Sequence, residues 1–299
     1  MNRQEQIQQI TGGNVQTLAR AISLVENDVD GYEALLEGLP ADSGAQVLGI
    51  TGPPGAGKST LTDALIGAFV RQGKRVGVLC VDPSSPFHRG ALLGDRIRMS
   101  EWYNHPGVFI RSLASRGSLG GLHPRIIEIT DLLKAARFDP VIIETVGVGQ
   151  SEVEIAGLAD TTIVVEVPEA GDEIQTMKAG LMEIADIFVV NKADRPDADR
   201  FARNLRMMLA PAFNREQPVE IIKTIATQQQ GIDELLTAIA KHHPSATGTD
   251  RKYRLLADKS YQLIRHKRMQ GIDREALFHA IKSASEKGTF NFYRFIHTF

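Results

Sequence analysis

Apolar residues within the first 40 positions recur with the period of an α-helix. The i, i+3, i+4, i+7 spacing of one helix face is shared by Leu18, Ala21, Ile22 and Val25. A second, shorter apolar face is formed by Tyr32, Leu35 and Leu36. The turn-forming segment ADSG at 41–44 then interrupts the pattern. We therefore expect a helical N-terminal extension over residues 1–44.

Beyond residue 45 the pattern changes to short apolar runs separated by segments of helix length. The runs are mostly continuous and rich in β-branched residues, which is typical of strands covered on both faces, and they lie at 46–51, 75–81, 108–113, 140–144, 161–167, 186–191 and 219–224. The amphipathic segments between them lie at 58–71, 124–137, 173–184, 197–209 and 231–242. Parallel strands need crossover connections of this length. The predicted fold class for residues 45–243 is therefore α/β, with a mostly parallel sheet wrapped by helices.

The alternation of strands and helices stops near residue 243. The segment HHPSATGTD at 242–250 is typical of a linker, and apolar residues at helical spacing then predict a helix over 251–270. Five aromatic residues stand among the last ten, FNFYRFIHTF. Because such a tail needs cover from water, we predict that 244–299 is a helical extension that contributes to a homodimer. The alternative is that the tail folds back on its own domain.

Composition and charge narrow the classes of partner. The 34 Lys and Arg residues nearly balance the 36 Asp and Glu residues, giving a net charge of −2, so no nucleic-acid partner is expected. No apolar run approaches a membrane span, and the N-terminus MNRQEQIQQI lacks the apolar core of a signal peptide. The single cysteine, Cys80, fits a reducing compartment. We expect a cytoplasmic protein without a membrane partner.

The segment GPPGAGKS at 52–59 matches the phosphate-binding pattern G-x-x-x-x-G-K-[ST]. Its glycines let backbone N–H groups point at a phosphate near the positive end of the next helix. Lys58 would add a charge on the β and γ oxygens, and the Ser59 hydroxyl would bind Mg²⁺. An apolar strand before the segment and the helical STLTDALIGAFV after it favour this interpretation over a glycine-rich surface turn. The expected nucleotide-binding residues are Gly52, Pro53, Pro54, Gly55, Ala56, Gly57, Lys58, Ser59 and Thr60.

A second motif, Asn191-Lys192-Ala193-Asp194, follows the apolar run DIFVV and matches the guanine-reading pattern N-K-x-D. The carboxylate of Asp194 can accept hydrogen bonds from guanine N1–H and the exocyclic amine, which adenine does not offer in that geometry. Asn191 can bridge to N7 and to the phosphate-binding loop, and the Lys192 stem can lie along the ring. The alternative for Asp194 alone is a helix N-cap. After the last strand, backbone groups of Ile225, Ala226 and Thr227 are expected near guanine O6.

Several longer segments together resemble the cobalamin-mutase chaperone GTPases, the methylmalonyl-CoA mutase-associated proteins, also labelled arginine/ornithine transport kinases. The segments are GITGPPGAGKST (49–60), VDPSSPFHRGALLGDRIRM (81–99), SLASRGSLGGL (112–122), IIETVGVGQSE (142–152), VPEAGDEIQTMKAG (167–180) and VVNKAD (189–194). The resemblance implies a GTP hydrolase that uses Mg²⁺ and gates cobalamin loading or protection of an acyl-CoA mutase such as methylmalonyl-CoA mutase. It also implies GTP and GDP as ligands and no cobalamin bound by this chain itself.

The resemblance further implies residues near the metal and the γ-phosphate. Asp82 ends the second apolar run, and its alternative role is to form the turn before Pro83. Glu144 stands where most GTPases carry the Asp of D-x-x-G, and a carboxylate ending an apolar strand is costly without a cation. Gly147 can donate its N–H to the γ-phosphate. Asp95 is a further catalytic candidate. The alternative that it is a solvated loop carboxylate has equal weight.

The catalytic set is incomplete in the sequence. Fast GTPases carry a water-orienting Gln directly after the D-x-x-G glycine, whereas this chain has Val148 there and Gln150 two positions later. Gln150 and Asp172 are the expected partner-coupling residues, although Asp172 also suits a helix N-cap. A partner is therefore expected to complete the site. The candidates for a stabilising guanidinium, each of which also suits a surface or structural role, are Arg89, Arg96, Arg98, Arg111 and Arg116.

Two other functions share parts of these patterns. A nickel-delivery GTPase of the hydrogenase or urease maturation type needs soft or imidazole ligands at ligand spacing, and here one cysteine lies in an apolar run while the histidines are dispersed. A small-molecule kinase needs an acceptor pocket, which no motif marks, and the guanine-reading motif disfavours ATP. We keep both as alternatives to the mutase-directed GTPase.

Overall fold

The computed structural model describes residues 2–40, 44–82, 99–114, 122–145, 151–168, 179–212, 219–242, 246–268 and 272–297. The chain divides into two compact units, Met1–Lys252 and Tyr253–Phe299, and each is described by itself. The boundaries that we expected at residues 44 and 243 remain predictions.

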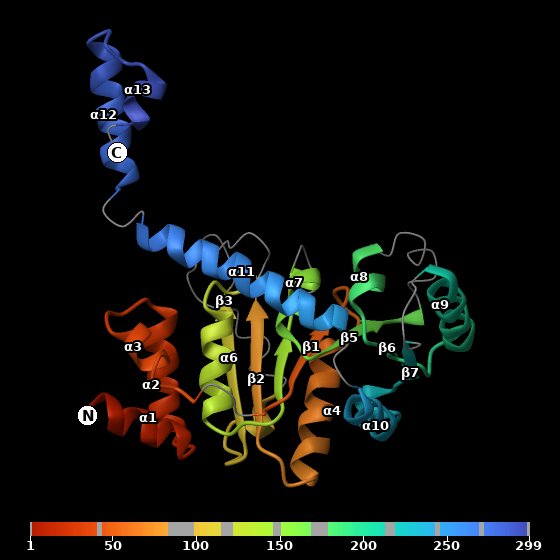
Figure 1. The fold of residues 1–299 in the computed structure, drawn as a ribbon. Coiled ribbons are helices and arrows are strands. Elements are labelled where there is room, and N and C mark those ends of the chain that lie inside the picture. Colours follow the sequence, from red (N-terminus) through yellow and green to blue (C-terminus); the bar gives the residue numbers. More distant parts are fainter. Residues whose placement is uncertain are drawn as a thin grey trace. The chain divides into compact units, whose positions relative to one another are not determined.

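Among the described residues, one sheet of parallel strands forms the centre of the first unit (Figure 1). Its strands are β1 (Val47–Thr51), β2 (Val76–Asp82), β3 (Val108–Ala114), β4 (Val141–Glu144), β5 (Thr161–Glu166), β6 (Ile187–Val190) and β7 (Glu220–Lys223), in the order β3-β2-β4-β1-β5-β6-β7. Each lies within one residue of the predicted range at either end. The α/β fold class with a mostly parallel sheet is therefore confirmed.

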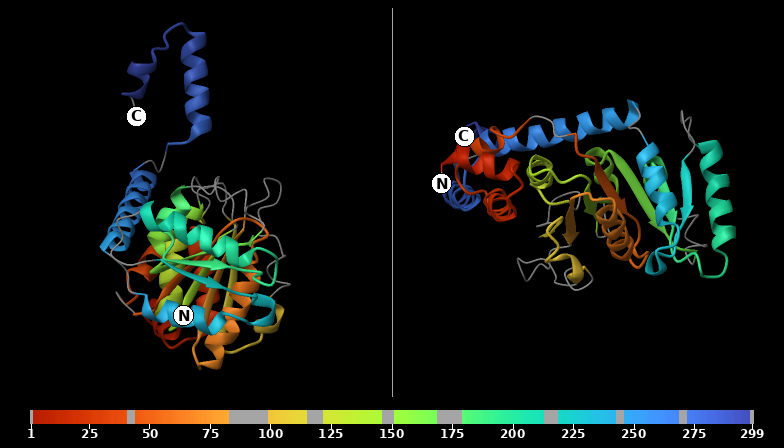
Figure 2. Two further views of the ribbon diagram at one scale, coloured as in Figure 1. Left: turned by 90° about the vertical axis from the view of Figure 1, so that its right-hand side faces the viewer. Right: turned by 90° about the horizontal axis from the view of Figure 1, so that it is seen from below.

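Helices cover both faces of this sheet, as Figure 2 shows in the view from below. The helices are α4 (Lys58–Arg71), α6 (Ile126–Ala135), α7 (Ser151–Leu158), α8 (Ala179–Ile184), α9 (Ala198–Ala212) and α10 (Ile232–Lys241). In β5, Ile163 packs in the cluster with α4 and α10, while the next residue, Val164, packs in the cluster with α8 and α9. Because both faces are buried, the strands are continuous apolar runs without polar alternation.

Helix α7 is a described element of the first unit that the sequence pattern did not predict. Its eight residues, SEVEIAGL, carry no one-sided apolar stripe. Ile155 and Ala156 are buried, and Ile155 lies beside Gly49 of β1, where an added Cβ would come within 2.6 Å of its side chain. A short helix buried in this way has little periodicity to detect.

The N-terminal helices α1 (Arg3–Thr11), α2 (Val15–Glu26) and α3 (Tyr32–Leu36) confirm the helical extension (Figure 1). Asn2 and Glu5 form a capping box at the start of α1, and Asn14 Oδ1 accepts from the Thr17 N–H at 2.9 Å at the start of α2. The predicted apolar face of α2 is buried and packs against α6. The apolar periodicity of this segment therefore identified the face of α2 that packs against α6.

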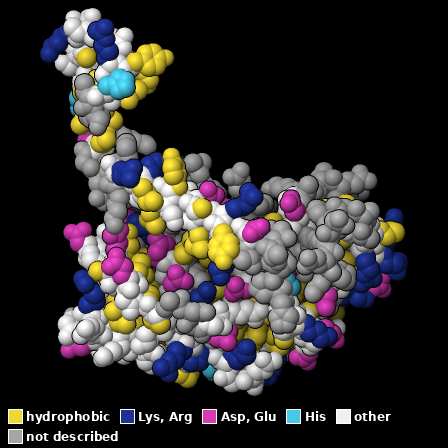
Figure 3. Space-filling view, viewed as in Figure 1, with side chains coloured by type: hydrophobic (Ala, Val, Ile, Leu, Met, Phe, Trp, Pro, Cys, Tyr) yellow, Lys and Arg dark blue, Asp and Glu magenta, His cyan; other side chains and the backbone are white. Residues whose placement is uncertain are grey.

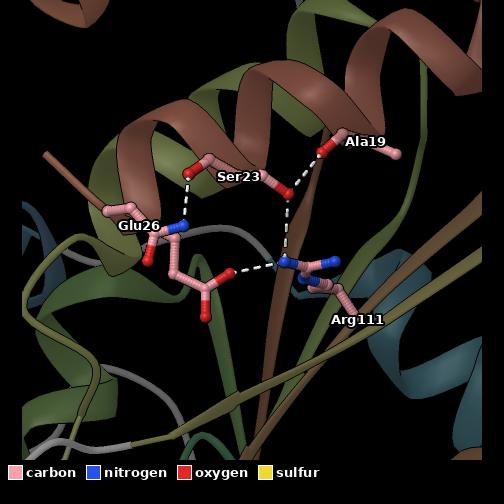
Figure 4. Close-up of polar contacts among 5 residues, drawn as sticks. Ala19, Ser23, Glu26 and Arg111 are labelled. Carbon is pink, nitrogen blue, oxygen red and sulfur yellow. Dashed lines mark hydrogen bonds and ion pairs between the residues drawn. The ribbon is translucent and has the colours of Figure 1, made fainter. Parts of the chain in front are cut away.

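Arg111 of β3 ties α2 to the sheet (Figure 4). Its guanidinium donates to Ser23 Oγ at 3.3 Å and forms an ion pair with Glu26, both on α2. The charge of Arg111 is thus neutralised by a helix of the N-terminal extension. This contact agrees with the structural role, which was one of the two alternatives for Arg111 in the sequence analysis.

The end of the chain is more helical than expected. Helix α11 (Ala246–Arg268) begins inside the predicted linker 242–250, so the part of that prediction from 246 onward is wrong. The second unit continues with α12 (Arg274–Glu286) and α13 (Phe292–Ile296), capped by Asp273 and Asn291. Apolar side chains are exposed along these helices (Figure 3), and they include Tyr253, Tyr261, Phe278, Phe292 and Tyr293. No helix within the described ranges has the length and apolar character to cross a membrane.

Candidate functional site

The candidate site lies at the carboxyl ends of the central strands. Strand β1 stands between β4 and β5, and the loop after β1 leads into α4. In open α/β sheets, ligands bind outside the carboxyl ends of the strands where the strand order reverses. Both predicted nucleotide motifs meet there, one after β1 and the other after β6.

At two positions of the loop between β1 and α4, the backbone conformation and the close neighbours leave room only for glycine. Gly52 has φ +136°, and an added Cβ would lie 2.1 Å from the Val165 carbonyl oxygen. Gly57 has φ +89°, and an added Cβ would lie 2.4 Å from Asn191 Nδ2. Gly57 is also the N-cap of α4 and supplies no side-chain cap. The N–H groups and positive end of α4 therefore face the loop, an arrangement that binds phosphate.

Lys58 lies across this loop. Its side chain is buried, and Nζ donates to the carbonyl oxygens of Gly52 at 2.8 Å and Pro53 at 3.0 Å. Backbone carbonyls of the residues just before Lys58 thus hold its ammonium group at the phosphate-binding loop. The contact of Lys58 with phosphate oxygens remains a prediction.

Ser59 and Glu144, which were both predicted as metal ligands, contact each other in the structure. Glu144 ends β4 beside Ile50 of β1, and its carboxylate is 5% exposed. Ser59 Oγ donates to Glu144 Oε1 at 2.6 Å, and Thr62 Oγ1 donates to Oε2 at 2.9 Å. A buried carboxylate with these hydroxyls, at the end of a phosphate-binding loop, supplies the hard oxygen ligands that Mg²⁺ prefers. Thr62 was not among the predicted site residues.

The predicted base-reading motif is joined directly to the phosphate-binding loop. Asn191 Nδ2 donates to the Ala56 carbonyl at 2.9 Å, and Lys192 Nζ donates to the Gly55 carbonyl at 2.8 Å. Lys192 has φ +56°, which turns the chain directly after β6. Asp194 is exposed on the same loop. The predicted bridge from Asn191 to the loop is thus present.

Asn191 also organises the loop after β7. Its Oδ1 accepts from Thr224 Oγ1 at 3.0 Å and from the Ala226 N–H at 3.2 Å. Ile225 N donates to Gln230 O at 3.1 Å, and a short 3₁₀ turn runs over Ala226–Gln228. The segment predicted to approach guanine O6, Ile225–Thr227, therefore lies beside the base-reading motif. In this structure the Ala226 N–H is directed at Asn191.

Several predicted site residues lie outside the described residues. These are Asp95, Gly147, Gln150 and Asp172, together with Arg89, Arg96, Arg98 and Arg116. The backbone of Asp82 is described as the last residue of β2, opposite Ala114, but its side chain is not. Their roles remain predictions.

Two further polar contacts, one of β1 and one of α4, were not predicted. Thr145 Oγ1 donates to Thr51 Oγ1 at 2.9 Å, joining the ends of β4 and β1. Trp102 Nε1 donates to Asp63 Oδ1 at 2.7 Å, joining the short 3₁₀ turn Ser100–Trp102 to α4. The i+3 spacing of Thr62 from Ser59 was a signal for a shared helix face, whereas these two contacts have no local signal.

Among the described residues, no three or more His, Cys, Asp or Glu side chains come together.

Comparison with protein families decides the relationship. The model of the methylmalonyl-CoA mutase-associated GTPase MeaB matches residues 18–283. The chain belongs to the MeaB family. A putative GTPase of Pyrococcus horikoshii, PH0274, is 48% identical over 243 residues, which cover 80% of this chain and 77% of that protein. A fused isobutyryl-CoA mutase of Geobacillus kaustophilus is 36% identical over 265 residues, covering 83% of this chain and 24% of that protein.

Solved structures show the same fold. A LAO/AO transport system kinase has a TM-score of 0.67 and 29% identity, with 100% of this chain and 97% of that chain covered. HypB from Helicobacter pylori, solved in complex with nickel, has a TM-score of 0.52 and 18% identity over 75% of this chain and 97% of that chain. The likeness to HypB shows the shared fold alone. The resemblance to the mutase-associated GTPases that the motifs indicated is thus confirmed at the level of the family.

Proposed function

We propose that this chain hydrolyses GTP with Mg²⁺ and uses the cycle to gate cobalamin loading or protection of an acyl-CoA mutase. The observation that carries the nucleotide half is the join between the two motifs. Asn191 and Lys192 donate to the carbonyls of Ala56 and Gly55 within the phosphate-binding loop. A nucleotide whose phosphates are bound by the loop would therefore present its base to the N-K-x-D motif at a fixed position. The motif can then favour one base over another.

Guanine is the base that this arrangement supports. Asp194 is exposed three residues after Asn191, on a loop that β6 and the contact of Lys192 with Gly55 position. A carboxylate there accepts from both N1–H and the exocyclic amine of guanine. Adenine lacks that pair of donors, so its binding would leave a desolvated carboxylate without partners.

The residues at the phosphate end fit a bound Mg²⁺. Ser59 Oγ and the buried Glu144 carboxylate would hold it, with Asp82 added from the end of β2. When bound, Mg²⁺ neutralises negative charge on the phosphate oxygens. The chain itself orients the metal ligands. The Ser59 hydroxyl donates a hydrogen bond to Glu144, and this bond sets the direction of the lone pairs on Ser59 Oγ.

The mutase half of the proposal is supported by the comparisons. The matched family is named for its association with methylmalonyl-CoA mutase, and a relative carries this domain fused to isobutyryl-CoA mutase. Val148 stands at the position where fast GTPases carry the water-orienting glutamine. A partner that supplies a water-orienting group would raise a slow intrinsic rate. The client would then bind the GTP and GDP forms with different affinity.

We expect a cobalamin-dependent acyl-CoA mutase to raise the GTPase rate by at least about tenfold, since one supplied catalytic group contributes that much or more. Purified methylmalonyl-CoA and isobutyryl-CoA mutases are titrated separately into a phosphate-release assay. Asp172→Ala should reduce the stimulation and leave the basal rate near that of the wild type. Neither stimulation nor a nucleotide-dependent complex with either mutase would contradict the client, whereas phosphate transfer to a small acceptor would indicate a kinase.

We also propose a homodimer that depends on the C-terminal helices. Tyr261, Phe278, Phe292 and Tyr293 are exposed within Tyr253–Phe299, and exposed aromatic side chains in this number favour a partner surface. Sedimentation should show a dimer for the full chain and a monomer for a chain that ends near Pro244. The same oligomeric state for both chains would contradict this role.

A further inference from the structure

Two hydroxyls of α4 hold the carboxylate that ends β4. Ser59 Oγ donates to Glu144 Oε1 at 2.6 Å, and Thr62 Oγ1 donates to Glu144 Oε2 at 2.9 Å. Thr62 is 0% exposed and Glu144 is 5% exposed. Each carboxylate oxygen therefore has its own donor in a site screened from water, where such bonds are strongest.

The spacing of the two donors explains why a glutamate stands at this position. Ser59 and Thr62 are three residues apart on α4, which places their hydroxyls on one face and about 4.5 Å apart along the helix axis. The carboxylate must reach from the end of β4 to both of them. An aspartate would be shorter by one carbon–carbon bond, about 1.5 Å. The longer side chain is matched to a pair of hydroxyls on the helix.

The second hydrogen bond controls the direction of the first. A carboxylate held through one oxygen can rotate about its terminal bond, which is a soft torsion. Thr62 holds the other oxygen and so fixes the plane of the Glu144 carboxylate. That plane sets the direction in which the Ser59 hydroxyl donates its proton, and hence the direction of its remaining lone pairs.

We propose that Thr62 is a positioning residue for Mg²⁺, acting through Glu144 and Ser59. The inference rests on the proposed Mg²⁺-dependent guanine nucleotide site. Partners that orient metal ligands typically change metal affinity tenfold to a hundredfold when they are removed. Thr62 therefore contributes to the affinity for Mg²⁺ without contacting the nucleotide. A threonine that only stabilises the fold would affect nucleotide binding with and without Mg²⁺ alike.

The test measures GDP affinity as a function of Mg²⁺ concentration and again in EDTA, using full-length Thr62→Val and Thr62→Ser variants. Thr62→Val should raise the Mg²⁺ concentration for half-maximal tightening at least about tenfold and leave the affinity in EDTA unchanged. Thr62→Ser keeps the hydroxyl and should behave like the wild type. The matched control is Thr130→Val on α6, because Thr130 is also buried and donates to a helix carbonyl, Ile126 O, at 2.6 Å. It should leave the Mg²⁺ dependence unchanged.

Glu144→Asp by itself provides a second measurement that does not depend on how well Thr62→Val folds, and the double variant then tests whether the two side chains act together. The shorter side chain should weaken the response to Mg²⁺ as Thr62→Val does, and adding Thr62→Val to it should cause little further loss. An unchanged Mg²⁺ dependence in Thr62→Val, an equal loss of affinity in EDTA, or fully additive effects with Glu144→Asp would overturn the inference. A wild-type chain that binds GDP without any response to Mg²⁺ would instead contradict the proposed function.

Discussion

Replacing Asp194 with asparagine should lower the affinity for GTP at least about a hundredfold and create affinity for XTP. In the proposed guanine site the carboxylate would accept two hydrogen bonds from the base, and losing bonds to a charged acceptor costs about 3 kcal/mol. An asparagine amide places a donor where xanthine offers a carbonyl in place of the guanine amine. Competition titrations with GTP, XTP and ATP measure both effects.

Asp197→Asn is the matched control for this variant. Asp197 is exposed three residues further along the same segment, before α9 and outside the N-K-x-D motif, and Asp197→Asn makes the same chemical change. It has φ +67°, a conformation that asparagine tolerates. The control should keep the wild-type preference for GTP. Equal affinity of the wild-type chain for ATP and GTP would contradict the guanine assignment.

Replacing Lys58 with alanine should reduce GTP turnover by about thirtyfold to a thousandfold and weaken nucleotide binding. Removing one charged contact to a developing phosphate charge in a shielded site costs about 2–4 kcal/mol. Lys58 is buried at the phosphate-binding loop, where Nζ donates to Gly52 O and Pro53 O. Single-turnover hydrolysis and nucleotide titration separate the effect on the chemical step from the effect on binding.

Lys223→Ala tests whether the loss depends on the position of the charge. Lys223 ends β7, and its exposed side chain forms an ion pair with the exposed Asp199 at 2.6 Å. Exposed pairs of this kind contribute little to stability, so turnover should stay near that of the wild type. Wild-type turnover by Lys58→Ala would show that the loop has no catalytic role.

The side chain of Asn191 connects the base-reading motif with two other loops. Asn191 contacts the phosphate-binding loop through Ala56 and the loop after β7 through Thr224 and Ala226. One buried side chain therefore connects three loops that arise from three different strands. Such a network is costly to break in part, because each unpaired group would remain away from water. The base and phosphate halves are held as one unit.

The sequence by itself determined the strands of the sheet, the α/β class and the two nucleotide motifs. Continuous apolar runs such as 161–167 and segments such as GPPGAGKS carry their information in adjacent residues, because the strand and the loop are local structures. Local patterns failed for a short helix without a one-sided apolar stripe and for the start of a polar helix. Helix α7 lacked a one-sided stripe, and α11 began at Ala246 inside an apparent linker.

Only the tertiary structure decided which distant residues share the site. The strand order places β1 between β4 and β5, and this brings Thr62 to Glu144 across 82 residues and Asn191 to Ala56 across 135. It also paired Arg111 with Glu26 on the N-terminal helix α2. Periodicity records which face of an element is buried, but a hydrogen bond between two elements depends on their packing. The pairing of Glu144 with both hydroxyls of α4 is a property of that packing.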